Sequence, residues 1–134
     1  MNLKYMFDTN ICIYLMNKRS QSVIDKIKQH KDDGICISSI TLAELEYGAY
    51  KSIHYEKNIV SIQKMLSLFD ILYFDEAAAS SYGDIRATLE GKGQIIEPLD
   101  MLIAGHAKSK SLILVTNKTK EFQCVDGLTI ENWV

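Results

Sequence analysis

The segment YMFDTNICIYLM, residues 5–16, joins a short apolar run to an amphipathic one through a single acid, Asp8. Three apolar residues that stop at an aspartate are typical of a short buried strand. Asp8 or Thr9 would then cap a helix over the apolar positions that follow. The segment therefore predicts a strand that passes directly into a helix, with a carboxylate at the carboxyl end of the strand.

The same alternation continues along the chain. Apolar runs of three or four residues predict further strands at 35–37, 71–73, 112–115 and 128–130. Between them, helical spacing and start signals predict helices over 23–30, from Ser39 to about 48, from 55 to 69, from 78 to 89 after a cap at Asp75, and from Pro98 to about 108. Strands alternating with helices indicate an α/β sandwich with a mostly parallel sheet, whose functional site lies beyond the carboxyl ends of the strands.

Composition narrows the class of protein. The 134 residues, 47% of them hydrophobic, suit one domain over 1–134. A net charge of −2 gives no bulk signal of nucleic-acid binding, so a polyanion would have to meet a local patch or a bound metal. The odd number of cysteines, three, and the absence of a signal peptide or a membrane-length apolar run indicate a cytoplasmic protein with reduced thiols.

Three acids stand where such a fold would place a site. Asp8 follows the first strand, Glu44 lies in the helix opened by Ser39, and Asp100 lies in the first turn after Pro98. Each has an ordinary alternative: a helix cap for Asp8, a solvated helix face for Glu44, and a favourable helix-start charge for Asp100. If they converge, their mutual repulsion requires a cation. Oxygen ligands without His or Cys favour Mg²⁺, with Mn²⁺ as a substitute.

Four segments in this order resemble the PIN-domain ribonucleases, and within them the VapC-type toxins of bacterial toxin–antitoxin pairs. They are FDTNICIYLM (7–16), ISSITLAELEYGAYKS (37–52), PLDMLIAGHAKS (98–109) and LILVTNKTKEF (112–122), and the ending VDGLTIENWV is also similar. The resemblance covers essentially the whole chain. It implies a three-layer α/β/α sandwich and a Mg²⁺-dependent endoribonuclease that cuts RNA, often tRNA, and so stops translation. Asp8, Glu44 and Asp100 match the family's acids in order.

One position departs from the family pattern. Many relatives carry Asp or Asn two residues after the threonine of the last motif, where this chain has Lys118. Glu121 or Asn117 would then complete the metal site, and Lys118 would contact substrate phosphate, or the fourth ligand is absent. Hydroxyl and amide groups that would orient carboxylates or water belong to Thr9, Asn10, Ser39 and Thr116. The alternative for both threonines and Ser39 is capping or turn chemistry.

The resemblance also implies partners: a VapB-type antitoxin, an RNA substrate, a second copy in a homodimer, and DNA only indirectly through the antitoxin. An apolar surface that would serve the homodimer or the antitoxin, or else the core, includes Tyr47, Tyr50, Tyr55, Ile59 and Ile62. An aspartyl phosphatase is disfavoured because its second acid would fall at Asn10. A catalytically silent PIN-like module that binds RNA or a partner remains the alternative function.

Overall fold

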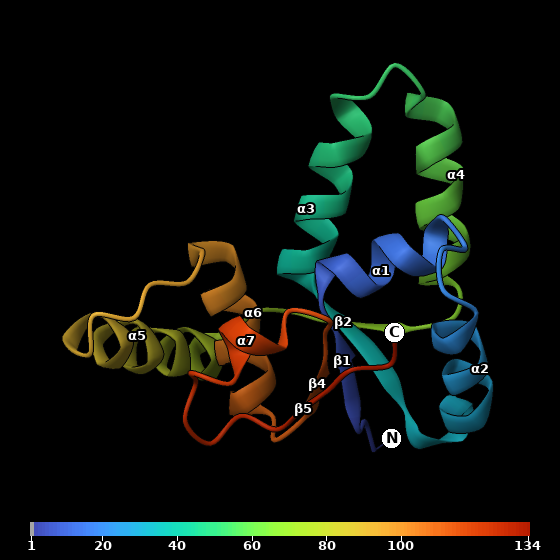
Figure 1. Ribbon diagram of the computed structural model, residues 1–134. Helices are drawn as coiled ribbons and strands as arrows, with labels where there is room; N and C mark the ends of the chain where they lie inside the picture. The colour runs from blue at the N-terminus through green and yellow to red at the C-terminus, as the bar shows by residue number, and fades with distance from the viewer. Residues whose placement is uncertain (1) are drawn as a thin grey trace.

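A five-stranded parallel sheet forms the centre of the computed structural model, which describes residues 2–134 (Figure 1). The strands are β1 (Tyr5–Phe7), β2 (Ile35–Ser38), β3 (Asp70–Leu72), β4 (Ile113–Val115) and β5 (Ile130–Glu131). Their order across the sheet is β3-β2-β1-β4-β5, and every neighbouring pair is parallel. The expected α/β fold is confirmed.

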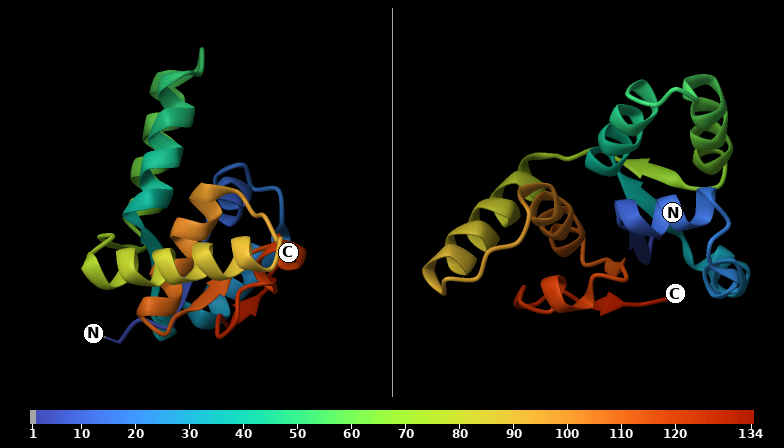
Figure 2. Two further views of the ribbon diagram at one scale, coloured as in Figure 1. Left: turned by 90° about the vertical axis from the view of Figure 1, so that its left-hand side faces the viewer. Right: turned by 45° about the horizontal axis from the view of Figure 1, so that its top comes forward.

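Helices cover both faces of the sheet, as a three-layer sandwich requires (Figure 1). One layer holds α1 (Thr9–Met16), α2 (Gln21–His30), α3 (Ser39–Tyr50) and α4 (Tyr55–Leu66), with a short 3₁₀ turn at Lys31–Asp33. The other holds α5 (Glu76–Gly91), α6 (Pro98–Ser109) and α7 (Thr119–Phe122). The paired helices α3 and α4 project beyond the sheet as a hairpin (Figure 2). Within the described residues, no helix is both long and apolar enough to cross a membrane.

Two hydrophobic cores follow from the alternation of side chains along the strands. Tyr5 and Phe7 of β1 face the layer of α1 to α4, whereas Met6 faces α5 and α6. Ile35 and Ile37 of β2 likewise face one way, and Cys36 faces the other. Successive residues of a strand point to opposite faces, so an unbroken apolar run marks a strand that is covered on both sides.

The element boundaries differ from the sequence pattern at a few places. The helix expected to reach Phe69 ends at Leu66, and Phe69 enters the core from the connection that leads into β3. The last strand begins at Ile130 rather than Leu128. The four-residue helix α7 was not expected, because a single turn leaves too short a stretch for an apolar stripe to be recognised.

The strand order places a crevice at the centre of the sheet. From β1 the chain adds β2 and β3 on one side, and it later adds β4 and β5 on the other. In open parallel sheets, the point where the order reverses leaves a crevice at the carboxyl ends of the strands. Here it lies between β1 and β4, which are followed directly by Asp8 and Thr116.

Candidate active site

Asp8 is fixed at the carboxyl end of β1 and is only 1% exposed. Its Oδ1 accepts a hydrogen bond of 2.9 Å from the backbone N–H of Ile11, so Asp8 caps α1. Burial raises its pKa from 3.8 to about 6, against the opposing effect of a hydrogen bond from Thr116, and the nearby charge of Asp100 raises it further. Capping and a place in the crevice, which were alternatives for this residue, occur together.

Asp100 lies in the first turn of α6 and is 5% exposed. The ammonium group of Lys118 donates a hydrogen bond of 3.1 Å to its Oδ2. Glu121 of α7 lies against the same carboxylate. Burial raises the pKa of Glu121, and its hydrogen bond and charge interaction with Asp100 raise it further. Its Oε2 is buried and accepts no hydrogen bond from the described residues.

Glu44 reaches the site from α3. Its Oε1 accepts a hydrogen bond of 2.6 Å from the hydroxyl of Thr9. Burial raises the pKa of Glu44, the Thr9 hydrogen bond lowers it, and the charges of Asp100 and Glu97 raise it again. Glu44 therefore faces the other acids, whereas Glu46, two residues further along α3, does not line the same groove.

The proposed supporting residues divide into two groups. Thr116 is fully buried, contacts Asp8, and accepts a 2.9 Å hydrogen bond from the N–H of Lys118, which fixes the turn after β4. The side-chain oxygen of Asn117 is buried without a hydrogen-bond donor among the described residues. The hydroxyl of Ser39 points elsewhere, because it accepts a 3.0 Å hydrogen bond from the N–H of Phe74 beyond β3. Its role is therefore to hold the end of β3.

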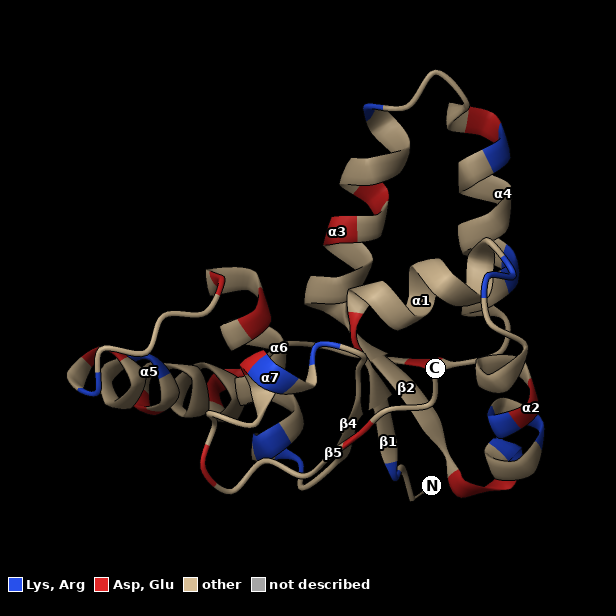
Figure 3. Ribbon diagram, in the orientation of Figure 1, with Lys and Arg blue, Asp and Glu red and all other residues tan. Residues whose placement is uncertain are grey.

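A groove of about 660 Å³ opens over Glu44 and Asp100. Its lining includes Thr9 and Asn10 of α1, Glu44 of α3, Asp100 of α6, and Lys118. Figure 3 shows the acidic segments on α3, α6 and α7. The lining also includes Glu97, an acid that sequence reasoning missed. Glu97 is hard to identify as a site residue from the sequence, because an exposed glutamate directly before a helix-opening proline is common at the start of any helix.

The donor set fits a hard divalent cation. Raised pKa values at Asp8, Glu44 and Glu121 indicate carboxylates that repel one another and are poorly solvated. Buried oxygens of Asn117 and Glu121 lack donors among the described residues. Within that part of the chain, no three acidic, histidine or cysteine side chains already surround a single point. Instead, the ammonium of Lys118 supplies the positive charge beside Asp100.

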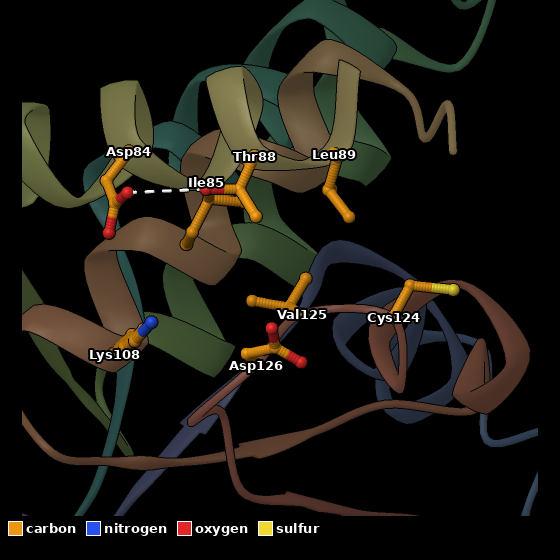
Figure 4. Close-up of a pocket in the computed structure, with 8 residues that line it drawn as sticks. All are labelled: Asp84, Ile85, Thr88, Leu89, Lys108, Cys124, Val125 and Asp126. Carbon is orange, nitrogen blue, oxygen red and sulfur yellow. Dashed lines mark hydrogen bonds between the residues drawn. The ribbon is translucent and has the colours of Figure 1, made fainter. Parts of the chain in front are cut away.

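A second pocket, of about 130 Å³, lies apart from these acids. Figure 4 shows Asp84 and Thr88 of α5, Lys108 of α6, and Cys124 to Asp126 around it. Asp84 accepts a hydrogen bond from Thr88, and Asp126 is paired with Lys92 outside the pocket. None of its lining residues belongs to the acidic groove. This pocket therefore provides control positions for experiments on the groove.

The buried side chain of His106 connects the two helical layers. Its Nδ1 lies 2.7 Å from the hydroxyl of Ser38, the residue that caps α3, and its ring meets Phe74 edge-on. Nε2 is buried without a partner among the described residues. Burial lowers the pKa of His106, as does the charge of Lys110, so the folded protein favours the neutral ring.

His106 is expected to make the fold less stable in mild acid. Because its pKa is lower in the folded state, the unfolded chain takes up the proton more readily once the pH falls below about 6.5. Urea unfolding of His106→Gln and wild type at pH 7 and pH 5 measures this effect. The contribution of Asp8 to stability has the opposite pH dependence in that range. Both proteins therefore carry Asp8→Asn in this comparison, so that they differ only at His106. An equal loss of stability in both proteins on acidification would contradict the prediction.

Comparisons with known proteins agree with this fold and groove. The PIN domain model matches residues 5–128. The chain is 47% identical over 131 residues to the tRNA(fMet)-specific endonuclease VapC of Shigella flexneri, covering 98% of each chain. It is 45% identical over 132 residues to ribonuclease VapC2 of Haemophilus influenzae strain Rd, covering 98% of this chain and 99% of that one.

Comparisons with solved structures agree with the family match. One chain of a DNA-bound VapBC structure from Salmonella typhimurium superposes with a TM-score of 0.94 at 41% identity, with 98% of this chain and 99% of that chain covered. VapBC2 from Rickettsia felis, bound to a promoter DNA fragment, matches with the same TM-score and identity, covering 98% and 100%. The family match and these near full-length identities show that the chain belongs to the PIN-domain family and, within it, to the VapC group.

Proposed function

We propose that the chain is the endoribonuclease toxin of a type II toxin–antitoxin pair, that it cuts RNA in a Mg²⁺-dependent reaction, and that tRNA is its substrate. The observation that carries this proposal is the gathering of Asp8, Glu44, Asp100 and Glu121 at the carboxyl ends of β1 and β4. The names of the relatives as ribonucleases and as a tRNA(fMet)-specific endonuclease support the choice of RNA. Cleavage of tRNA would stop translation.

Asp8 and Asp100 would hold the metal ion, with Glu44 and Glu121 completing the acidic surroundings. When bound, Mg²⁺ activates water and stabilises charge on the phosphoryl group. Neighbouring side chains hold these acids in position. Thr116 orients Asp8, and the hydroxyl of Thr9 holds Oε1 of Glu44. The ion pair with Lys118 neutralises Asp100, and the same ammonium group would compete with a cation for that carboxylate.

The same proposal covers partners and location. A VapB-type antitoxin would bind this chain, and the antitoxin rather than this chain would contact DNA. The DNA-bound VapBC structures of relatives support that arrangement. A homodimer would use part of the α3–α4 surface outside the groove, where Tyr50 is 70% exposed while Ile62 is buried. The cytoplasm is the expected compartment, since an RNA substrate is found there and the three cysteines are free thiols.

Incubation of purified protein with total tRNA tests the proposal. Cleavage is expected with Mg²⁺ and not with EDTA. Asp100→Asn should lower the rate by more than about 100-fold, because loss of even a supporting partner of a metal ligand costs about 10–100-fold. Asp84→Asn, an exposed acid at the second pocket, is the control and should cleave normally. A protein that binds RNA but never cuts it would instead be the silent binding module.

Lys118→Met is expected to bind Mn²⁺ roughly tenfold more tightly, the equivalent of about 1.4 kcal/mol. The substitution removes the ammonium group that pairs with Asp100 and competes with a cation for it. Isothermal titration of Mn²⁺ into the RNA-free protein measures the change. Lys110→Met, which removes the lysine of the exposed pair with Asp75, is the matched control. Unchanged or weaker Mn²⁺ binding by Lys118→Met would show that the lysine does not compete with the metal.

A further inference from the structure

Four side chains of different chemical character lie along one face of α3 and its C-terminal end. Ile40, Glu44, Tyr47 and Lys51 follow one another at intervals of four, three and four residues, which places them on the same side of a helix. All four line the acidic groove. With a rise of about 1.5 Å per residue, Tyr47 lies about 4.5 Å and Lys51 about 10.5 Å beyond Glu44 along the axis. The face thus leads outward from the acids to an aromatic ring and then to a cation.

Tyr47 is not part of the core. Its side chain is 65% exposed, and the ammonium of Lys51 lies 4.8 Å from the centre of its ring. Lys51 forms no ion pair with any residue that the structure describes, whereas Lys118, the other lysine of the groove, is already paired with Asp100. Lys51 is therefore the cation of the groove that remains available to an anion.

The space beside Tyr47 is open. A Cβ atom added to Gly48 would meet no atom within 4 Å, although Gly48 lies inside α3 and lines the groove. Glycine inside a helix costs about 0.5–1 kcal/mol relative to alanine. The position next to Tyr47 therefore carries no side chain and is open, and the ring itself is 65% exposed in the groove.

We propose that Tyr47 and Lys51 form a nucleotide subsite for single-stranded RNA, in which an unpaired base next to the cut phosphodiester stacks on Tyr47 and its phosphate contacts Lys51. The inference rests on the proposed ribonuclease function. Unpaired RNA bases are commonly recognised by stacking on tyrosine, and phosphates by lysine. The acids repel a polyanion, so the strand would run toward Lys51, the unpaired cation among the described residues of the groove, about 10 Å beyond Glu44 along the helix axis.

Substitution of Tyr47 tests the stacking. Tyr47→Ala is expected to raise the KM for RNA by about 5- to 150-fold, since stacking contributes about 1–3 kcal/mol per base, with kcat little changed. Tyr47→Phe keeps the ring and should behave like wild type. Tyr73→Ala is the control, because Tyr73 is an exposed tyrosine that does not line the groove. Equal melting temperatures would show that each variant is folded.

Substitution of Lys51 tests the phosphate contact. Lys51→Ala is expected to weaken RNA binding and to reduce the slope of log affinity against log salt concentration by about 1. Lys26→Ala, which removes an exposed lysine of α2 away from the groove, should leave both quantities unchanged.

Direct binding separates this proposal from the nuclease function. In an Asp8→Asn background, a single-stranded RNA oligonucleotide carrying 2-aminopurine reports stacking by loss of fluorescence. Quenching that depends on the ring at position 47 supports the subsite, whether or not the protein cuts RNA. If such quenching occurs but the wild-type protein cuts no RNA, the nuclease function alone is wrong. Normal cleavage and normal quenching with Tyr47→Ala overturn the subsite and leave the nuclease. A Tyr47→Ala protein that loses only antitoxin affinity also overturns it, because the ring would then serve a protein partner.

Discussion

Asp8→Asn is expected to abolish RNA cleavage and, at the same time, to make the metal-free protein more stable at neutral pH. The carboxylate is 1% exposed, and burial raises its pKa from 3.8 to about 6. A pKa difference of one corresponds to about 1.4 kcal/mol, so the buried charge costs the folded state up to about 3 kcal/mol above pH 6. Asparagine removes the charge, yet it still caps α1 because its side-chain oxygen can accept from Ile11.

The pH dependence of unfolding checks the sign of this effect. The folded state holds the Asp8 proton more tightly than the unfolded chain, so the wild-type stability attributable to Asp8 falls as the pH rises from about 4 to about 6 and is level above that. Asp8→Asn should lack this fall. Urea unfolding of both proteins in EDTA gives the difference, expected to be about 1–3 kcal/mol at pH 7.5. A less stable variant would mean that the carboxylate serves the fold rather than the site.

Added Mg²⁺ provides the complementary observation. A ligand that binds only the folded state stabilises it by RT ln(1 + L/Kd), where L is its free concentration, so the gain in stability rises with the logarithm of that concentration once it exceeds Kd. Wild type should therefore gain stability with Mg²⁺, whereas Asp8→Asn should gain much less. The same experiment with Asp84→Asn, at an exposed position of the second pocket, should reproduce wild type.

Gly105→Ala is expected to destabilise the protein by about 3 kcal/mol, the upper part of the range for overpacking. A Cβ at Gly105 would lie 2.7 Å from the backbone nitrogen of Tyr82 and 2.8 Å from its Cα. Because those atoms belong to the backbone of α5, no side-chain rotation can relieve the overlap, and α5 and α6 would have to separate. For a chain of this size, that loss corresponds to a drop in melting temperature of roughly 10 °C.

Gly83→Ala is the matched control for Gly105→Ala. Gly83 lies in the interior of α5, and an added Cβ would meet nothing within 4 Å. Alanine is the better helix former, so this variant should gain about 0.5–1 kcal/mol. Thermal unfolding of both variants and wild type provides the measurement. A Gly105→Ala protein as stable as wild type would show that the two helices do not need their close approach.

The fold could be predicted because local signals and global architecture agree. The run Tyr5–Phe7 is apolar throughout, as a strand covered on both faces requires, and Asp75 and Pro98 begin the helices expected of them. Helix ends were less certain. The apolar spacing from Tyr55 continues to Phe69, but the helix stops at Leu66 and Phe69 packs in the core from the turn that leads into β3. Periodicity reports which side chains are buried and not which backbone conformation buries them.

The site was predictable only in part. Asp8 could be placed at a strand end, since strand and acid are adjacent in the sequence. The pairing of Lys118 with Asp100 depends on the turn that Thr116 fixes after β4, and no local pattern contains that information. Ser39 illustrates the opposite error. It opens the helix that bears Glu44, yet its hydroxyl bonds to Phe74 on the far side of β2. Helix position alone does not determine where a side chain points.

The strand order has a consequence for how the protein is made. β1, the first strand synthesised, is paired on one side with β4, one of the last. A ribosome that has translated 110 residues has already produced Asp8, Glu44 and Asp100, but Asp8 still lacks the carbonyl of Val115 and the hydroxyl of Thr116 that hold it in place. The nascent chain therefore contains these three acids before they are brought together at the site. Assembly of the groove waits for the final fifth of translation, and a message cut short before that point yields a harmless fragment.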